Sequence, residues 1–364
     1  MKHCEHSQWL SLCTQDNEIT FFEFDRLRTL VDEIFNPDHQ ELSLLILIEN
    51  TAKTLALREI LSATKGWKTG RRRRHDEVHL HLNFFSTFHE SSILFTKGDF
   101  PDRNARAQHD FNEKCHETIR RILSRVREDV FEACQSAIVD YLYFRLFYSF
   151  VDVFCFFSAN FDEFSSIVRH LASWLDNDKS LTLSETTNSW VIMITKTLTS
   201  DFATENEVKN RFLSMLKDET TKDLSAWFFV LDVLCIFSLD DISNKARLRP
   251  LKECLMNASD QVQVRRMISR TLFLTRHFVA FFRLACDHFA RTFKKLFDFI
   301  RVSWSWNSLS PDLNKHLFNF LSKVKSSYKL TKFAVSAIAF FFLLDSYSSN
   351  MHGKRNVLFI RCQI

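Results

Sequence analysis

Glycine and proline are scarce in this chain, which has four of each among 364 residues, beside 39 phenylalanines. At average usage, about 40 residues of the two kinds together would be expected. Glycine supplies the positive-φ conformations of tight turns, and proline ends helices. Phosphate-cradling loops, nucleophile elbows and dinucleotide-binding turns need glycine at fixed positions, and none of these motifs is present. The composition therefore predicts long helices and argues against several large classes of enzyme.

Membrane-spanning runs and a secretory signal are also missing. The first ten residues, MKHCEHSQWL, lack the apolar core of a signal peptide. The longest apolar stretch, Phe333–Leu344, has 12 residues, whereas a helix needs about 20 to span a bilayer. Nine cysteines form no C-x-x-C pair, so free thiols in a reducing compartment are expected. We therefore expect an intracellular protein, nuclear or cytoplasmic, with no membrane contact.

Internal similarity is the second strong signal. Asp152–Ser158 (DVFCFFS) recurs 80 residues later as Asp232–Ser238 (DVLCIFS). A period of 80 is close to two units of roughly 40 residues, the size of HEAT and armadillo repeats. The sequence thus predicts an all-α fold, an irregular α-solenoid in which each helix pair covers the apolar face of its neighbour. Residues 150–218 and 230–298 should superpose as equivalent helices, with Cys155 and Cys235 at the same buried position.

Composition and charge divide the chain into four expected segments. Residues 128–241 carry 8 basic and 19 acidic side chains, a net charge of −11, and residues 242–364 carry 21 and 6, a net charge of +15. The segments are an N-terminal helical segment (1–65), an irregular connection with Gly, Arg and His (66–108), acidic helical repeats (109–241), and basic helical repeats with a C-terminal tail (242–364). Within the connection, residues 78–84 alternate like a strand, but the repeat comparison favours a helix there.

The basic third contains a candidate interaction surface. Its members are Arg265, Arg266, Arg270, Arg276, Arg291, Lys294 and Lys295. Clustered positive charge steers association with acidic partners. Three interpretations stay open: a solvated face, an acidic protein partner, and contact with nucleic-acid phosphates.

A run of four arginines lies in the irregular connection. It comprises Arg71, Arg72, Arg73 and Arg74. The run is typical of an exposed charged loop, and its functional interpretation is a nuclear localisation patch.

Histidines are densest immediately after that run, at His75, His79, His81 and His89. His75 and His79 have the i, i+4 spacing that lets two imidazoles bind one zinc ion. The run reads H-D-E-V-H, however, whereas the zinc-protease motif H-E-x-x-H needs Glu directly after the first His. We therefore expect no cofactor and no catalytic metal, and whether this group binds a metal stays open.

Two acidic residues, Asp152 and Asp232, lie inside apolar runs. A buried carboxylate needs a hydrogen-bond donor, and a recurring structural contact is the simplest role for both.

The expected function follows from the absence of catalytic and cofactor-binding motifs. We expect a non-enzymatic helical-repeat scaffold or adaptor subunit of an intracellular complex, binding protein partners with an acidic surface and no small-molecule substrate. The alternative is a nucleic-acid-associated helical protein that uses its basic C-terminal third.

Overall fold

A computed structural model covers the chain and places most of its first 299 residues. The residues described are 7–15, 18–48, 52–60, 77–82, 91–99, 117–123, 138–158, 161–176, 188–195, 204–222, 224–236, 243–269, 271–299, 302, 315, 318, 319 and 322. The chain divides into two compact units, Met1–Phe297 and Asp298–Ile364. All the elements named below belong to the first unit.

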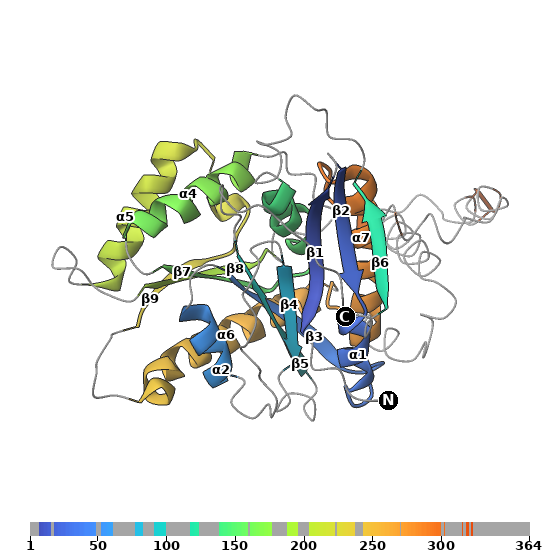
Figure 1. The fold of residues 1–364 in the computed structure, drawn as a ribbon, viewed down its shortest axis with the longest axis horizontal. Coiled ribbons are helices and arrows are strands. Elements are labelled where there is room, and N and C mark those ends of the chain that lie inside the picture. Colours follow the sequence, from blue (N-terminus) through green and yellow to red (C-terminus); the bar gives the residue numbers. More distant parts are fainter. Residues whose placement is uncertain are drawn as a thin grey trace. The chain divides into compact units, whose positions relative to one another are not determined.

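The described residues of the first unit are organised around a nine-stranded mixed sheet (Figure 1). Its order is β6-β2-β1-β4-β5-β3-β7-β8-β9. The strands β5, β3, β7, β8 and β9 run parallel to one another, whereas β6, β2, β1 and β4 form an antiparallel extension that joins them at β5. The bounds are β1 (Gln8–Gln15), β2 (Glu18–Phe24), β3 (Glu41–Ile48), β4 (Glu77–Leu82), β5 (Ser91–Gly98), β6 (Thr118–Ile122), β7 (Val153–Ser158), β8 (Trp190–Thr195) and β9 (Leu231–Cys235).

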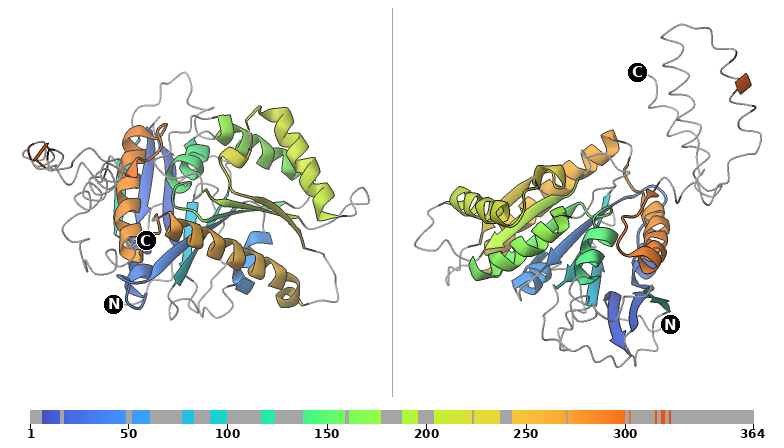
Figure 2. Two further views of the ribbon diagram at one scale, coloured as in Figure 1. Left: turned by 180° about the vertical axis from the view of Figure 1, so that it is seen from behind. Right: turned by 90° about the horizontal axis from the view of Figure 1, so that it is seen from above.

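Helices cover both faces of the parallel half of the sheet. α2 and α6 pack on one face and α4 and α5 on the other, while α7 lies along the antiparallel half (Figures 1 and 2). The helices are α1 (Arg26–Asp32), α2 (Ala52–Ile60), α4 (Phe161–Asp176), α5 (Glu205–Glu219), α6 (Asn244–Ile268) and α7 (Thr275–Thr292), with a π-helix η3 (Leu142–Phe147) and a 3₁₀ turn η5 (Leu224–Ala226). This is a layered α/β architecture.

The predicted all-α solenoid is therefore wrong, and so is the description of the chain as α-helical with helical repeats. Most residues of β3, and all of those in β7 and β8, are buried. Parallel strands covered on both faces read as continuous apolar runs, which periodicity alone does not distinguish from buried helix. The helical character expected for residues 1–65 and 109–241 is wrong as well, because the first range contains β1, β2 and β3 and the second contains β6, β7, β8 and β9. The boundaries of the four segments stay predictions.

The recurring segment is a strand followed by a helix. Asp152–Ser158 covers β7 and the residue before it, and residues 232–235 of the second copy lie in β9. Cys155 and Cys235 are both buried on strands that flank β8. The prediction of equivalent helices is wrong, because the similarity arises from two strand–helix units of one sheet.

The alternating segment after the arginine run is a strand. β4 shows the half-buried and buried alternation of a strand with one covered face. The helix favoured there was wrong, and the period-two pattern was the correct signal.

Two observations bear on the expectations about free thiols and membrane-spanning helices. Cys155, Cys235, Cys254 and Cys286 are free thiols. In the part of the chain that the structure describes, no helix combines the length and the apolar character that crossing a bilayer requires.

Candidate functional site

The sheet has a topological switch point between β3 and β7. From β3 the chain continues through α2 and the antiparallel strand β4 to β5 on one side, whereas from β7 it continues through α4 to β8 on the other. In open α/β sheets, ligands bind outside the carboxyl ends of the strands where the strand order reverses. The ends of β3, β5 and β7 are therefore where this fold would bind a small ligand.

A lysine lies in the first turn of α2, the helix that follows β3. Leu47–Thr54 reads LIENTAKT, and the phosphate-binding motif between a strand and a helix is G-x-x-x-x-G-K-[ST]. Lys53 and Thr54 match its last two positions, whereas Leu47 and Ala52 replace both glycines. Sequence reasoning missed this site because it required the glycines. The signal available was a Lys-Thr pair a few residues after an apolar strand.

Lys53 is bound by the chain itself. Its side chain is 2% exposed, and Nζ donates a hydrogen bond to the carbonyl oxygen of Gly98 over 2.7 Å and forms an ion pair with Asp99. The hydroxyl of Tyr143, from η3, donates to the Asp99 carbonyl oxygen over 3.3 Å. In phosphate-binding loops the equivalent lysine contacts the nucleotide phosphates. Here a carboxylate of the same chain supplies the negative charge.

Gly98 is required by the close approach of Tyr143. A Cβ atom at position 98 would overlap the Tyr143 hydroxyl. We therefore expect Gly98→Ala to lower the free energy of unfolding by about 1–3 kcal/mol, the usual cost of overpacking. Urea denaturation measures it, and Gly98→Ala with Tyr143→Phe should recover part of the loss. An unchanged midpoint for Gly98→Ala would contradict this packing.

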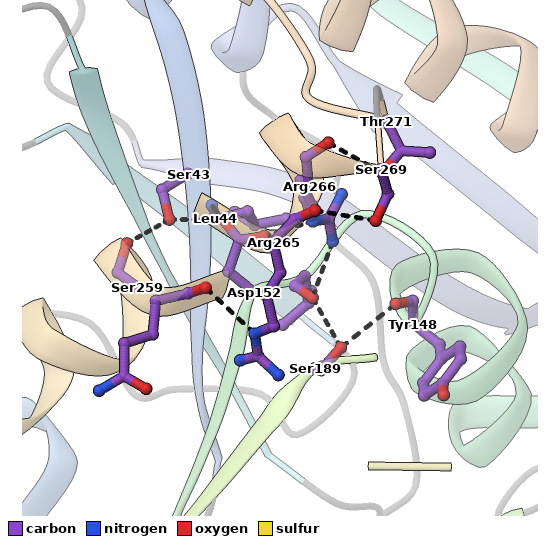
Figure 3. Close-up of polar contacts among 12 residues, drawn as sticks. Ser43, Leu44, Tyr148, Asp152, Ser189, Ser259, Arg265, Arg266, Ser269 and Thr271 are labelled. Carbon is purple, nitrogen blue, oxygen red and sulfur yellow. Dashed lines mark hydrogen bonds and ion pairs between the residues drawn. The ribbon is translucent and has the colours of Figure 1, made fainter. Parts of the chain in front are cut away.

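The opposite, amino-terminal edge of the parallel strands holds a buried ion pair (Figure 3). Asp152, directly before β7, and Arg266, near the end of α6, have side chains 1% and 2% exposed, with 2.9 Å between Oδ1 and Nε. Asp152 Oδ2 accepts a hydrogen bond from the Ser43 hydroxyl over 2.5 Å and from the Leu44 amide over 3.3 Å. The hydroxyls of Ser43 and Ser259 are 2.6 Å apart. This network joins β3, β7 and α6.

Arg266 also donates a hydrogen bond to the backbone. Arg266 Nη2 donates to the carbonyl oxygen of Val151 over 3.2 Å, and that oxygen also accepts the Ser189 hydroxyl over 2.6 Å (Figure 3). Burial raises the pKa of Asp152 above its ordinary value, although Arg266, Ser43 and the Leu44 amide oppose the shift. The network lies at the edge away from the switch point, and its role is to join a helix to the sheet.

The structure separates the members of the candidate basic surface. Arg266 is in the core, and the Arg265 guanidinium lies 3.2 Å from the centre of the Phe229 ring. Arg276 is exposed and pairs with Asp38 over 3.0 Å. Arg291 is exposed in the last turn of α7, exposed Lys294 and Lys295 follow that helix, and Arg270 lies outside the described residues. Arg266 therefore cannot contribute to an exposed surface, and the others stay candidates.

Of the clustered histidines the structure describes two, and of the four consecutive arginines it describes none. His79 and His81 are on β4, where i, i+2 residues share a face. His79 Nε2 lies 3.5 Å from a Glu77 carboxylate oxygen. Across the described residues no group of three or more His, Cys, Asp or Glu side chains could hold a metal ion. The described residues do not include His75, His89, Arg71, Arg72, Arg73 or Arg74.

His81 makes stability depend on pH. Burial lowers its pKa well below the ordinary value, and the positive charges of His79, Arg26 and Lys97 add to the shift. The folded protein keeps His81 neutral, whereas the unfolded chain takes up a proton as the pH falls through about 6.5. Stability should thus be full above that pH and fall by about 1.4 kcal/mol per pH unit below it. Melting temperatures from pH 7.5 to 5.5 measure the slope, and an equal slope in His81→Gln would contradict it.

The thiols of Cys235, Cys254 and Cys286 are not activated nucleophiles. Cys286 is fully buried, and burial raises its pKa well above the ordinary value. Burial also raises the pKa of Cys235 and of Cys254 to about 11. The neighbouring His288 interacts with Thr292 and the Lys295 carbonyl oxygen. These thiols are therefore protonated at neutral pH, whereas thiol catalysis uses the thiolate.

Comparison with known proteins adds no family to this picture. No protein-family description matches the chain, and no curated protein matches it either. Function is therefore inferred from the site geometry.

Proposed function

We propose that this chain is a non-enzymatic α/β domain that serves as a scaffold or adaptor subunit and binds another macromolecule through its surface. One observation supports the proposal above the rest. Lys53, in the first turn of the helix at the switch point, is buried and bound to the Gly98 carbonyl oxygen and to Asp99. Nucleotide binding there would require breaking this ion pair, in a loop that lacks both glycines of the motif.

The charge of the chain favours a protein partner with an acidic surface. The net charge of residues 242–364 is +15. Phosphate binding by nucleic-acid proteins uses many exposed basic side chains together. Arg266 is buried and so cannot contact a phosphate group, and Arg276 is paired with Asp38. The interpretation as a nucleic-acid-associated protein therefore loses part of its support. We place the protein inside the cell, in the nucleus or cytoplasm, on the basis of its cysteine usage.

A phosphate-release assay tests the expected absence of nucleotide hydrolysis. We expect no release from ATP or GTP with Mg²⁺ above the protein-free rate, because Lys53 is not available to a γ-phosphate. Lys53→Ala should give the same baseline. Release by the wild-type protein that disappears in Lys53→Ala would contradict the proposal.

A further inference from the structure

The ion pair between Lys53 and Asp99 has the geometry of an occupied anion site. The Lys53 side chain is 2% exposed, and its Nζ donates to the Gly98 carbonyl oxygen over 2.7 Å and contacts the Asp99 carboxylate. A lysine ammonium has three donors and no acceptor, and a buried charge needs a partner of opposite charge. The Asp99 carboxylate is therefore the anionic ligand of a buried cation.

The position of Lys53 in the fold favours an anion there. Lys53 lies in the first turn of α2, and residues 52–55 of that turn include no acidic side chain. The positive end of the helix dipole thus adds to the charge of the ammonium group. The turn follows the carboxyl end of β3, at the switch point where α/β folds bind ligands.

The carboxylate is held in place through its own backbone. The Tyr143 hydroxyl donates to the Asp99 carbonyl oxygen over 3.3 Å, and the same hydroxyl would overlap a Cβ atom at Gly98. The Asp99 side chain is 20% exposed, whereas that of Lys53 is 2% exposed. Asp99 therefore shields the ammonium group of Lys53 and is itself reached by solvent.

We propose that Asp99 is an intramolecular plug in an oxyanion site, and that a carboxylate or phosphate group of a ligand binds Lys53 only when Asp99 leaves. The contact is autoinhibitory, because the Asp99 carboxylate occupies the position of the external anion and repels it. The ligand class is a small oxyanion, since a carboxylate is the group that the site holds. This inference rests on the proposed function and deepens it, because it names the contact that keeps nucleotides from Lys53.

Anion rescue of Asp99→Ala in the full chain tests the plug. The substitution removes a group of the size of formate and leaves Lys53 buried without a counter-charge. We expect a melting temperature below that of the wild type in sodium chloride. Replacing chloride by formate or inorganic phosphate at constant ionic strength should raise it saturably, by about 5 °C at 100 mM, because an anion that binds only the folded state stabilises it.

Three controls separate binding at Lys53 from general salt effects. Formate and phosphate also act on folded proteins without a specific site, so each rise is compared with that of the wild type, in which we expect no saturable rise. Lys53→Met combined with Asp99→Ala removes the cation and should abolish the saturable rise. Asp38→Ala removes an exposed carboxylate that pairs with Arg276, and it should respond as the wild type does.

The two anions distinguish the sources of the oxyanion. A saturable rise with formate alone supports a carboxylate ligand, and a larger rise with phosphate supports a phosphorylated one. An equal response of Asp99→Ala, the double variant and the wild type would overturn the proposal. If Asp99→Ala is unfolded in chloride, circular dichroism measures its refolding, and no refolding by either anion at about 100 mM would also overturn it.

Failure of the plug and failure of the proposed function give different results. The plug is tested in Asp99→Ala with small anions, whereas the proposed function is tested in the wild-type protein with nucleotides. Nucleotide hydrolysis by the wild type would contradict the proposed function. An Asp99→Ala variant that no anion rescues would leave the proposed function intact and remove only the oxyanion site.

Discussion

Replacing Asp152 by alanine should lower the free energy of unfolding by about 3–5 kcal/mol, because it leaves Arg266 buried without its counter-charge. The two side chains are 1% and 2% exposed, and the hydrogen bonds from Ser43 and Leu44 would be lost as well. Arg266→Met should be similarly destabilising. Urea denaturation followed by circular dichroism measures both losses.

Two comparisons separate the ion pair from general disruption. The double variant Asp152→Ala with Arg266→Met should lose less than the sum of the single losses, because no uncompensated buried charge remains. The exposed pair Arg249–Glu253 lies on the same helix, and Arg249→Ala should leave the midpoint unchanged. Additive losses would show that Asp152 and Arg266 do not interact as the structure places them.

Removal of the Trp174 side chain should cost a similar amount, about 3–5 kcal/mol. Trp174 lies on α4 and is 1% exposed. Its ring centroid is 5.6 Å from that of Phe154 and 6.0 Å from that of Phe156, both on β7. Because it fills the interface between α4 and the sheet, Trp174→Ala would leave a cavity there.

Trp174→Phe should lose less than Trp174→Ala in urea denaturation, since a ring of smaller size still fills part of the site. Phe35→Ala, at a side chain 73% exposed, should leave the midpoint unchanged. A loss in Trp174→Ala below about 1 kcal/mol would mean that α4 does not cover this face of the sheet.

The sequence specifies local elements better than the fold class. Thr204 and Glu207 form the capping box that begins α5, and its S/T-x-x-E pattern is readable from the sequence. The apolar runs of β3 and β7 are equally visible, but their burial on both faces hides the strand period. Glycine scarcity was misleading, because crossover helices connect the parallel strands without tight hairpin turns.

The pairs Asp152–Arg266 and Lys53–Asp99 each join residues that are far apart in the sequence. The need of Asp152 for a donor was predictable, whereas its partner Arg266 lies far along the chain and was expected on the surface. Lys53 lacks the glycine neighbours that mark a phosphate-binding loop, and its partner Asp99 follows a different strand. The order of the strands in the sheet brings both pairs together, and that order cannot be predicted from the amino-acid composition.

Isothermal titration of the full chain with GTP and with ATP, each with Mg²⁺, tests the central claim most directly. If Lys53 is bound to Gly98 and Asp99, neither nucleotide should give saturable heat at concentrations up to about 1 mM, the weak end of specific binding. Saturable binding with a Kd below about 100 μM, abolished by Lys53→Ala in a variant that remains folded, would contradict it.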